Sequence, residues 1–375
     1  MNTNIGILFT NLGPYHLSRI EACVKYFQKC KMNIIAIELA QLQKEYPWEA
    51  KREDYNFPIF SIVQNTVLEK INFFHLLFKV NYGLTKINPD VVVISGYSEP
   101  GMLFALLWSI FHNRPTILLS PSKEDDKSRK WWKEKLKVFI VQKYTSALVG
   151  GKAHKEYLIK LGIPEKGIFL GYNVVGNNIF HPDNICHLTN PLTKPYFFAI
   201  NRFVTKKNLT LLIDAYAEYH KIKGDLSWNL VLSGDGKLRP QIEKQIDTLN
   251  LNNFIHLPGF LQQDELLPYF AHANCFVHAS IQEQWGLVVN EAMAAGLPVI
   301  VSNRCGCFDD LVMEGINGFG FYPQDQQALT QLMLKMSSEE VDLIAMGKAS
   351  LQHIQKYSPD YFAQGLMQAV EYSLA

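Results

Sequence analysis

Short runs of β-branched and aromatic residues alternate along the chain with segments in which apolar residues recur every three to four positions. The apolar runs predict strands at residues 5–11, 33–37, 90–95, 115–120, 146–151, 196–200, 228–234, 254–259, 275–280 and 298–302. The periodic segments between them predict amphipathic helices at residues 18–29, 68–79, 130–144, 209–219 and 265–272. Strands that alternate with helices indicate βαβ units, which form parallel sheets covered by helices on both faces. The pattern therefore predicts an α/β fold.

The alternation lapses between Gly171 and Pro195, a stretch that carries three prolines and several asparagines. With 375 residues the chain is also longer than a single core usually supports. We therefore expect a linker here, between two doubly wound α/β halves. Because ligands of such sheets bind at the carboxyl ends of the strands, two halves that face each other would form a cleft lined by strand-to-helix loops.

Two carboxylates, Glu283 and Glu291, stand eight residues apart around the strand-to-helix junction that follows residues 275–280. A helical interval of this length would separate them by about 12 Å. The paired carboxylates of glycosidases lie roughly 5–9.5 Å apart, so the spacing argues against hydrolysis by such a pair. Two separate contacts along an extended ligand fit better, because carboxylates accept hydrogen bonds from sugar hydroxyls.

Gly286 lies between the two carboxylates, where the absence of a side chain would let a ligand approach the backbone. The N–H groups of Gly286, Leu287 and Val288 could then receive an anion at the start of the helix. A hydroxyl cluster, a phosphate and a second hydroxyl cluster, in this order, describe a nucleotide sugar. The alternative is that Glu283 is a surface acid and Glu291 stabilises a helix start.

A second loop favours the ligand interpretation. Residues 200–216 read INRFVTKKNLTLLIDAY, in which a strand ends in a loop with Arg202, Lys206 and Lys207, and an amphipathic helix follows. Two or three cations at the carboxyl end of a strand can neutralise a diphosphate without a metal. The chain has no Walker-type GxxxxGKS/T motif, and GDGKLR at residues 234–239 lacks the third glycine of a dinucleotide fingerprint. The alternative for the two lysines alone is a solvated basic loop.

Five segments of the second half, in order, resemble retaining glycosyltransferases of family 4, the glycosyl transferases group 1 type. They are NRFVTKKN, LVLSGDG, IHLPGFL, CFVHASIQEQWGLVVNEAMAAGLPVIVS and EGINGFGF, and the resemblance covers most of residues 165–340. The segment GYNVVGNNIF is similar to the family's hinge, with Gly176 where an aspartate is common. Asn208, Ala279 and Gln284 also depart from the usual residues, which bears on the donor rather than on activity.

The resemblance implies the GT-B architecture, in which two Rossmann-like domains face each other across a cleft. Residues 1–175 would form the acceptor domain, completed by a C-terminal helix at about 357–375, and residues 176–356 would form the donor domain. It also implies a retaining transfer without metal or cofactor, in which the acceptor attacks from the leaving-group face. The donor would be UDP- or GDP-linked, and the acceptor would be a hydroxyl of a glycan, a lipid-linked molecule or a small molecule.

The resemblance also assigns roles to individual positions. Glu283 would contact the hydroxyls of the donor sugar, and Glu291 the ribose. Arg202 and Lys207 would stabilise the leaving phosphate. The other donor contacts would come from the backbone near Gly286, Leu287 and Val288, from the base-binding residues Gly259, Phe260 and Leu261, and from Gly13 in the first loop.

The first half offers four candidates for the acceptor side. His16 follows the Gly-Pro turn after the first strand, and either contacts substrate or folds against its helix. Tyr97 and Glu99 lie in the loop after residues 90–95, where Glu99 is alternatively the acid at a helix start. Lys123 lies in the loop after residues 115–120.

Residues 127–143 hold seven Lys and Arg against one acid, with Trp131 and Trp132 among them. A basic, aromatic amphipathic helix can lie on anionic lipid or grip an acidic acceptor. Peripheral contact with a membrane through this segment is therefore one hypothesis. The alternative is a solvated face with both tryptophans in the core.

Composition narrows the partners and the location. The 36 basic and 35 acidic residues nearly cancel, which argues against binding to nucleic acid. The longest apolar run, residues 101–111, is too short to span a bilayer, and the first residues do not resemble a signal peptide. The six cysteines have neither disulfide nor metal-site spacing. We therefore expect a cytoplasmic protein, at most peripheral on the inner face of a membrane.

Two alternative functions remain open. A sugar phosphorylase or a sugar-nucleotide epimerase could use the same fold, and would show phosphate dependence or activity without an acceptor. A non-catalytic nucleotide-sugar-binding subunit is the alternative from a different class. The presence of Glu283, Glu291, Arg202 and Lys207 argues against it.

Overall fold

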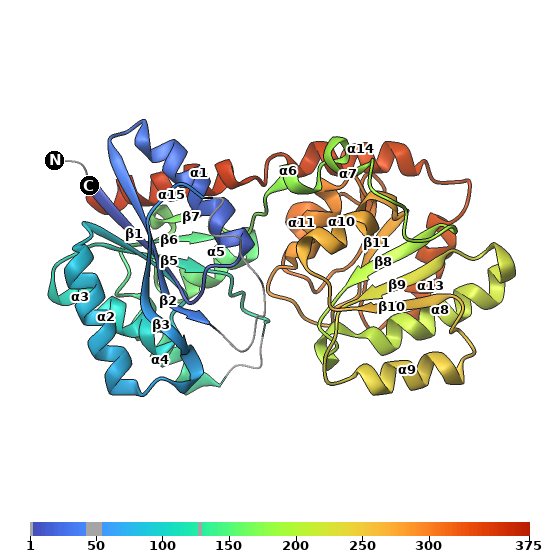
Figure 1. Ribbon diagram of the computed structural model, residues 1–375, viewed down its shortest axis with the longest axis horizontal. Helices are drawn as coiled ribbons and strands as arrows, with labels where there is room; N and C mark the ends of the chain where they lie inside the picture. Colours follow the sequence, from blue (N-terminus) through green and yellow to red (C-terminus); the bar gives the residue numbers. More distant parts are fainter. Residues whose placement is uncertain (1–2, 43–54, 127–129) are drawn as a thin grey trace. The chain divides into compact units, whose positions relative to one another are not determined.

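The computed structural model describes residues 3–42, 55–126 and 130–375, which fold into two compact units (Figure 1). Unit 1 comprises Met1–Gly176 and Tyr357–Ala375, and unit 2 comprises Asn177–Lys356. Each unit is a parallel sheet with helices on both faces. The predicted α/β fold of two doubly wound sheets is confirmed.

Unit 1 contains a seven-stranded sheet in the order β3-β2-β1-β4-β5-β6-β7, and every ladder in its described part is parallel. Its strands are β1 (Thr3–Phe9), β2 (Met32–Leu42), β3 (Ile59–Val67), β4 (Val91–Ser95), β5 (Thr116–Ser120), β6 (Ser146–Val149) and β7 (Ile168–Leu170). The chain runs from β1 to one edge of the sheet and then crosses back to β4. The direction in which successive strands are added to the sheet therefore reverses between β1 and β4.

Of the helices in the described part of unit 1, two cover one face of this sheet and four cover the other. On the first face lie α1 (Pro14–Gln28) and α15 (Pro359–Leu374); on the second lie α2 (Phe73–Ile87), α3 (Pro100–Phe111), α4 (Trp131–Val141) and α5 (Lys152–Lys160). In β4, Val91 and Val93 pack in the first core and Val92 and Ile94 in the second. Because both faces are covered, the central strands are continuous apolar runs.

Unit 2 contains a six-stranded parallel sheet in the order β10-β9-β8-β11-β12-β13. Its strands are β8 (Tyr196–Ile200), β9 (Asn229–Ser233), β10 (Ile255–Gly259), β11 (Cys275–His278), β12 (Val299–Ser302) and β13 (Gly318–Phe321). Its helices are α6 (Asn177–Phe180), α7 (Pro182–Ile185), α8 (Leu209–Lys223), α9 (Arg239–Thr248), α10 (Gln263–His272), α11 (Leu287–Ala294), α12 (Phe308–Leu311), α13 (Gln326–Met336) and α14 (Leu343–Ile354). Short 3-10 helices occupy Leu68–Lys70 and Glu165–Gly167 in unit 1, and Thr205–Lys207 and Gly224–Leu226 in unit 2.

The predicted linker at residues 171–195 is folded in part, since it contains the short helices α6 and α7. Its first residues are fixed to unit 1 by the buried Arg19. The Nε and Nη2 atoms of Arg19 donate to the carbonyl of Val174 at 3.1 and 2.8 Å. Its guanidinium also lies 5.1 Å from the centroid of the Tyr172 ring. Residues 171–176 are therefore part of unit 1, and the rest of the predicted linker, with α6 and α7, belongs to unit 2.

Two other expectations need correction. The helix predicted at residues 68–79 begins only at Phe73, because Leu68–Lys70 forms a 3-10 helix and Asn72 caps the α-helix by accepting from the Phe74 N–H at 2.9 Å. The tryptophans of the basic segment are exposed and do not lie in the core. The first three residues of that segment, 127–129, lie outside the described residues.

Candidate functional site

The central strand β8 of unit 2 has β9 on one side and β11 on the other, and the chain leaves these strands in opposite directions across the sheet. This arrangement is the topological switch point at which doubly wound sheets bind ligands. The loops after β8 and β11 meet there. The N–H of Ile281 in the second loop donates to the carbonyl of Lys206 in the first at 2.8 Å.

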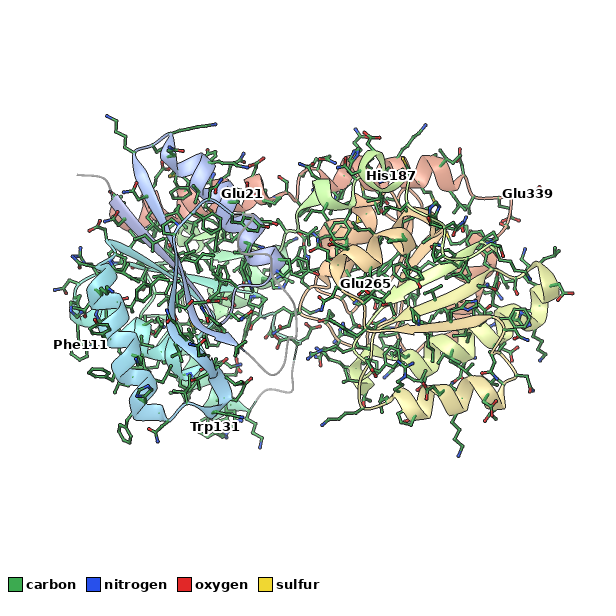
Figure 2. The ribbon with its side chains drawn as sticks, in the orientation of Figure 1. Glu21, Phe111, Trp131, His187, Glu265 and Glu339 are labelled. Atoms are coloured by element: carbon green, nitrogen blue, oxygen red, sulfur yellow. The ribbon has the colours of Figure 1, made fainter. Side chains whose placement is uncertain are left out.

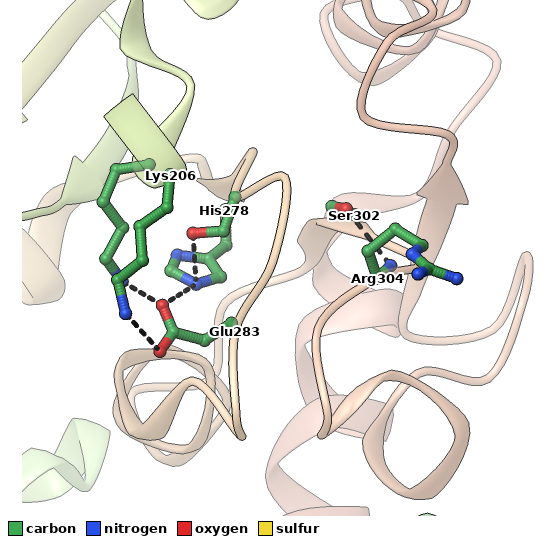
Figure 3. Close-up of polar contacts among 7 residues, drawn as sticks. Lys206, His278, Glu283, Ser302 and Arg304 are labelled. Atoms are coloured by element: carbon green, nitrogen blue, oxygen red, sulfur yellow. Dashed lines mark hydrogen bonds and ion pairs between the residues drawn. The ribbon is translucent and has the colours of Figure 1, made fainter. Parts of the chain in front are cut away.

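Side chains from the two loops form an ion pair at this point (Figure 3). The Nζ of Lys207 donates a hydrogen bond to Oε2 of Glu283. The Nζ of Lys206 lies 3.8 Å from Oε1 of the same carboxylate. Glu283 and Lys207 are largely buried, whereas the Lys206 side chain is 45% exposed. The structure thus brings together two residues that the sequence analysis had assigned to separate contacts.

The pair determines the protonation state of Glu283. Burial by itself would raise the pKa of this carboxyl, but the positive charge of Lys207 and its hydrogen bond, with a contribution from Lys206, lower it to about 2. Glu283 is therefore ionised at neutral pH and carries no proton to donate. It can accept hydrogen bonds, for example from hydroxyl groups, but it cannot act as a general acid.

His278, at the end of β11, lies directly behind this pair and was not recognised in the sequence analysis. Its Nε2 lies 3.9 Å from Oε2 of Glu283 and 3.3 Å from Oγ of Ser280, and its Nδ1 has no hydrogen-bond partner among the described residues. Burial and the nearby charge of Lys207 lower the pKa of His278 to about 3, so the ring is neutral. A histidine at the end of an otherwise apolar strand was the available signal.

The loop after β11 is held along its backbone by the loop after β12. The N–H of Gly306 donates to the carbonyl of Glu283, and the N–H of Cys307 to the carbonyl of Trp285, both at 3.1 Å. The buried indole of Trp285 donates from Nε1 to Oδ1 of Asn290 at 2.8 Å. These bonds fix the position from which the Glu283 carboxylate projects.

Gly286 connects this loop to α11 with φ of 106°, a left-handed conformation that favours glycine. A Cβ at this position would also lie 3.3 Å from Nε2 of His278. The first helical N–H groups, those of Leu287 and Val288, follow at the carboxyl edge of the sheet. Glu291 lies one turn further along α11 and is buried. A ligand could therefore approach the backbone closely at the start of α11.

The loops after β8, β9 and β10 are joined in the same way. The N–H of Phe203 donates to the carbonyl of Asp235 at 2.8 Å, and the N–H of Gly234 to the carbonyl of Gly259 at 2.7 Å. Gly234 has φ of 128°, and a Cβ there would lie 1.8 Å from the carbonyl oxygen of Asn201. The GDG stretch thus serves the contact between two loops, and Arg202 projects from the first of them as an exposed side chain.

The predicted base-binding residues lie on the next loop along this edge. Gly259 is the last residue of β10, and its carbonyl is already bonded within the sheet edge, to the Gly234 N–H and to Oγ of Ser233 at 3.2 Å. Phe260 is exposed, and Leu261 is partly exposed. Five loops of unit 2 therefore converge at the carboxyl ends of β8, β9, β10, β11 and β12.

Comparison with known proteins finds a family match in this part of the chain. Residues 183–353 match the family described as glycosyl transferases group 1. This group 1 region contains every site residue described so far. All of the strands of unit 2 also lie within it.

Two curated relatives each align with less than half of the chain. Alpha-monoglucosyldiacylglycerol synthase of Acholeplasma laidlawii is 28% identical over 165 residues, which is 44% of this chain and 40% of that protein. Sulfoquinovosyl transferase SQD2 of Arabidopsis thaliana is 32% identical over 172 residues, or 44% of this chain and 31% of that protein. The chain thus spans less than half the length of these relatives.

The fold of the whole chain has counterparts among solved structures. Anabaena Alr3699/HepE in complex with UDP-glucose has a TM-score of 0.78 at 18% identity, covering 99% of this chain and 100% of that one. The seven- and six-stranded parallel sheets and this similarity establish the GT-B fold.

Outside the group 1 region, unit 1 contains the remaining predicted residues. Gly13 is the N-cap of α1, and its N–H donates to Nδ1 of His16 at 3.2 Å. The His16 ring also packs on Phe9 at 4.2 Å between centroids. Burial and the charge of Arg19 lower the pKa of His16 to about 3, against a hydrogen bond with the backbone of Asn11 that raises it. His16 thus folds against the start of its own helix.

The loop that precedes Gly13 is supported by a buried acid that the sequence analysis missed. Oε2 of Glu38 accepts from the N–H of Leu12 at 3.1 Å, and Oε1 accepts from Oγ of Ser61 at 2.6 Å. Glu38 lies in β2 among apolar residues, where its carboxylate would be unfavourable without such partners. It fixes the β1–α1 loop in unit 1.

Of the other three acceptor-side candidates, Tyr97 and Lys123 are buried and Glu99 is partly exposed. Tyr97 is buried in the core beneath α2 to α5. Glu99 is the N-cap residue of α3, and burial raises the pKa of its carboxyl. Lys123 is buried, with its Nζ 3.2 Å from Oδ1 of Asp125. Glu99 thus lies at the start of a helix, as the alternative interpretation of this residue expected.

Neither a metal-binding cluster nor a membrane-spanning helix occurs among the described residues. No group of three or more His, Cys, Asp or Glu side chains in these residues could hold a metal ion. None of the helices described is long and apolar enough to cross a membrane. All six cysteines are thiols.

Proposed function

We propose that the protein is a glycosyltransferase that moves a sugar from a nucleoside-diphosphate sugar to a hydroxyl acceptor. The Lys207–Glu283 pair at the switch point of unit 2, inside the group 1 region, carries this proposal. It presents an anion for sugar hydroxyls and a cation for phosphate at the place where such sheets bind ligands. A phosphorylase, an epimerase and a non-catalytic binding subunit are the alternatives.

In this proposal Glu283 holds the donor sugar and does not transfer a proton. Its pKa of about 2 keeps it ionised, so it accepts hydrogen bonds from the hydroxyls of the sugar. Glu291 would contact the ribose. The loop of Gly259, Phe260 and Leu261 would contact the base.

The reaction develops negative charge on the departing nucleoside diphosphate. The ammonium of Lys207, the guanidinium of Arg202 and the N–H groups at the start of α11 would stabilise this charge. We propose that the bond from the anomeric carbon to the phosphate oxygen breaks while the acceptor oxygen bonds to that carbon on the same face. The acceptor proton would pass to the leaving phosphate, so the anomeric configuration is retained without a protein acid or a metal.

The comparisons support narrower choices of donor and acceptor. UDP-glucose is bound in the similar Anabaena structure, which supports a UDP-linked donor over a GDP-linked one. The Acholeplasma relative is named as a synthase of a glucosylated diacylglycerol, which supports a lipid-linked hydroxyl acceptor. The thiol state of the cysteines supports a cytoplasmic location.

The test is nucleotide binding followed by turnover. UDP at a hundred times its dissociation constant should stabilise the protein by about 2.7 kcal/mol, and GDP and ADP should stabilise it less. With UDP-sugars and EDTA present, Glu283→Gln should reduce donor hydrolysis or transfer about a hundredfold while it retains UDP binding. Glu340→Gln, at an exposed acid of unit 2, is the control and should leave both unchanged. Normal turnover by Glu283→Gln, or no response to any nucleotide, would refute the proposal.

A further inference from the structure

The outer surfaces of α2, α3 and α4 in unit 1 carry an unusual concentration of exposed apolar side chains. Of the 23 exposed large apolar residues in the described part of the chain, 12 belong to these three helices. They are Phe73, Phe74, Leu77, Phe78, Tyr82, Leu107, Ile110, Phe111, Trp131, Trp132, Leu136 and Phe139. The set includes every exposed Phe and Trp of the described residues except Phe260, so it is not a random scatter of surface residues.

The spacing shows that these residues form stripes on the outer side of each helix. On α2, Phe74, Phe78 and Tyr82 recur at four-residue intervals, and the rings of Phe78 and Tyr82 stack at 6.4 Å. The opposite side of α2, with Leu76 and Val80, is buried against the sheet. A helix that is apolar on its outer side after its inner side is already packed has a surface left for a partner.

The other two helices repeat this arrangement. On α4, Trp132, Leu136 and Phe139 form the outward stripe, and Val141 is buried on the inner side. On α3, Phe111 is 81% exposed. Figure 2 shows Phe111 and Trp131 projecting from the ribbon of unit 1 away from its sheet.

Lysines outnumber acidic residues on these three helices. Neither α2 nor α3 contains an acidic residue. The segment 130–143 has five lysines and one acid, Glu134, which is paired with Lys137 at 2.7 Å. Lys133 and Lys135 lie 5.3 and 5.0 Å from the rings of Trp132 and Trp131. Aromatic side chains next to lysines suit the interface of a bilayer, where rings enter the headgroup region and ammonium groups meet anionic lipid.

We propose that α2, α3 and α4 form a docking surface for a bilayer that contains anionic lipid. A second copy of this chain is a poorer occupant, because two such surfaces would place lysines against lysines, and the one acid of these three helices, Glu134, is already paired with Lys137. The proposal extends the contact expected from residues 127–143 to three helices, two of which have no basic cluster. It is independent of the proposed transfer reaction, because surface binding requires neither the donor nor the Lys207–Glu283 pair.

Vesicle co-sedimentation of the full chain tests the proposal. The protein should bind vesicles of phosphatidylcholine with about 30% phosphatidylglycerol, bind pure phosphatidylcholine at least tenfold more weakly, and dissociate as salt is raised. Removing one lysine of α4 should weaken binding about fivefold. Absence of binding to the anionic vesicles would overturn the proposal.

A triple variant separates this surface from general stickiness. Phe78→Ser, Phe111→Ser and Phe139→Ser together should weaken vesicle binding more than tenfold, since they remove one ring from each helix. Leu226→Ser with Ile344→Ser is the matched control, because these residues are 83% and 72% exposed in unit 2. UDP binding should be unchanged in both, so loss of vesicle binding and failure of the proposed function are distinguishable. Equal vesicle binding by the triple variant and the wild type would overturn the proposal. So would a wild-type dimer that the triple variant dissociates, because the surface would then bind a second copy.

A second readout does not depend on the folding of these variants. Lipids brominated in the acyl chains should quench the tryptophan fluorescence of the wild-type protein on anionic vesicles. Trp131→Phe with Trp132→Phe should lose most of this quenching while it still binds the vesicles. Binding without quenching of the wild type would mean that only the lysines touch lipid, and would overturn the apolar docking surface.

Discussion

Lys206 and Lys207 are neighbours in the sequence, but the structure gives them different surroundings. The Lys207 side chain is 12% exposed and bonded to Glu283, whereas the Lys206 side chain is 45% exposed and lies 3.8 Å away from the carboxylate. The two residues therefore form a matched pair for measuring the ion pair.

Lys207→Met should lower the free energy of unfolding by about 2 kcal/mol, because it leaves the Glu283 carboxylate buried without its main partner. Lys206→Met should lower it by less than about 0.5 kcal/mol. Urea denaturation of both variants at pH 7 measures this difference. Equal effects would mean that the ion pair contributes no more to stability than an exposed contact.

His278 gives the site a pH dependence. Its pKa of about 3 lies below the value near 6.5 in the unfolded chain, so the unfolded state binds the additional proton between these values. Stability attributable to His278 is thus complete above pH 6.5 and falls by about 1 kcal/mol per pH unit on acidification below it.

His278→Leu should therefore reduce the loss of stability between pH 6.5 and 4.5. The window stops at 4.5 because Glu283, with its lowered pKa of about 2, loses its contribution only as the pH falls from about 4.5 toward 2. Urea denaturation at several pH values compares the two proteins. Parallel pH profiles would show that His278 takes up its proton equally well in the folded protein.

At the scale of the elements, Gly234 determines how closely the loops after β8 and β9 approach each other. Gly234→Ala should lower the free energy of unfolding by about 3 kcal/mol, because the new Cβ would displace the backbone of Asn201 and φ is 128°. UDP binding should weaken at least tenfold, since Arg202 follows Asn201. Gly224→Ala is the control, because Gly224 also has a positive φ, 58°, but has open space around it. It should lower the free energy of unfolding by only about 1 kcal/mol, the cost of the backbone strain alone, and should leave UDP binding unchanged. Stability measurements and UDP titrations that fail to separate the two variants would contradict this account.

The sequence was sufficient for the central strands but not for three of the strands at the sheet edges. β3, β7 and β13 were not predicted, and all three are edge strands. β3 has polar residues such as Asn65 toward solvent, β7 has only three residues, and β13 reads GFGF. An edge strand is paired on one side and partly exposed, so it lacks the continuous apolar run by which central strands are recognised.

The same limit applies to the site. Glu283, Lys207 and Gly286 were identified because they belong to a dense local motif. The pairing of Lys207 with Glu283 could not be predicted, because it depends on strands β8 and β11 becoming neighbours although 74 residues of chain separate Ile200 from Cys275. His278 was missed because its burial against Gly286 depends on how the chain packs. The residue types along the sequence do not reveal that packing.

At the scale of the whole molecule, unit 1 is completed by a helix from the far end of the chain. Phe362, Leu366 and Val370 of α15 are fully buried against α1 and the sheet. The core of unit 2 is separate and contains Leu329. Each unit thus has its own core, although unit 1 is discontinuous in sequence.

Leu366→Ala and Leu329→Ala should therefore act on different transitions in calorimetry. Each variant should destabilise one unit by about 2–5 kcal/mol, the usual effect of truncating a buried leucine. UDP should raise the transition lowered by Leu329→Ala and leave the other unchanged. A single transition that both variants and UDP shift equally would show that the two units unfold together.

The return of α15 to unit 1 also bears on how the protein is made. A ribosome that has finished residues 1–176 has not yet produced the helix that covers α1, so this half must wait with an open apolar face while all of unit 2 is synthesised. Unit 2, contiguous in the chain, can close its core first. The order of folding is therefore the reverse of the order of translation, and chaperones that bind nascent chains should be needed for the first half and not for the second.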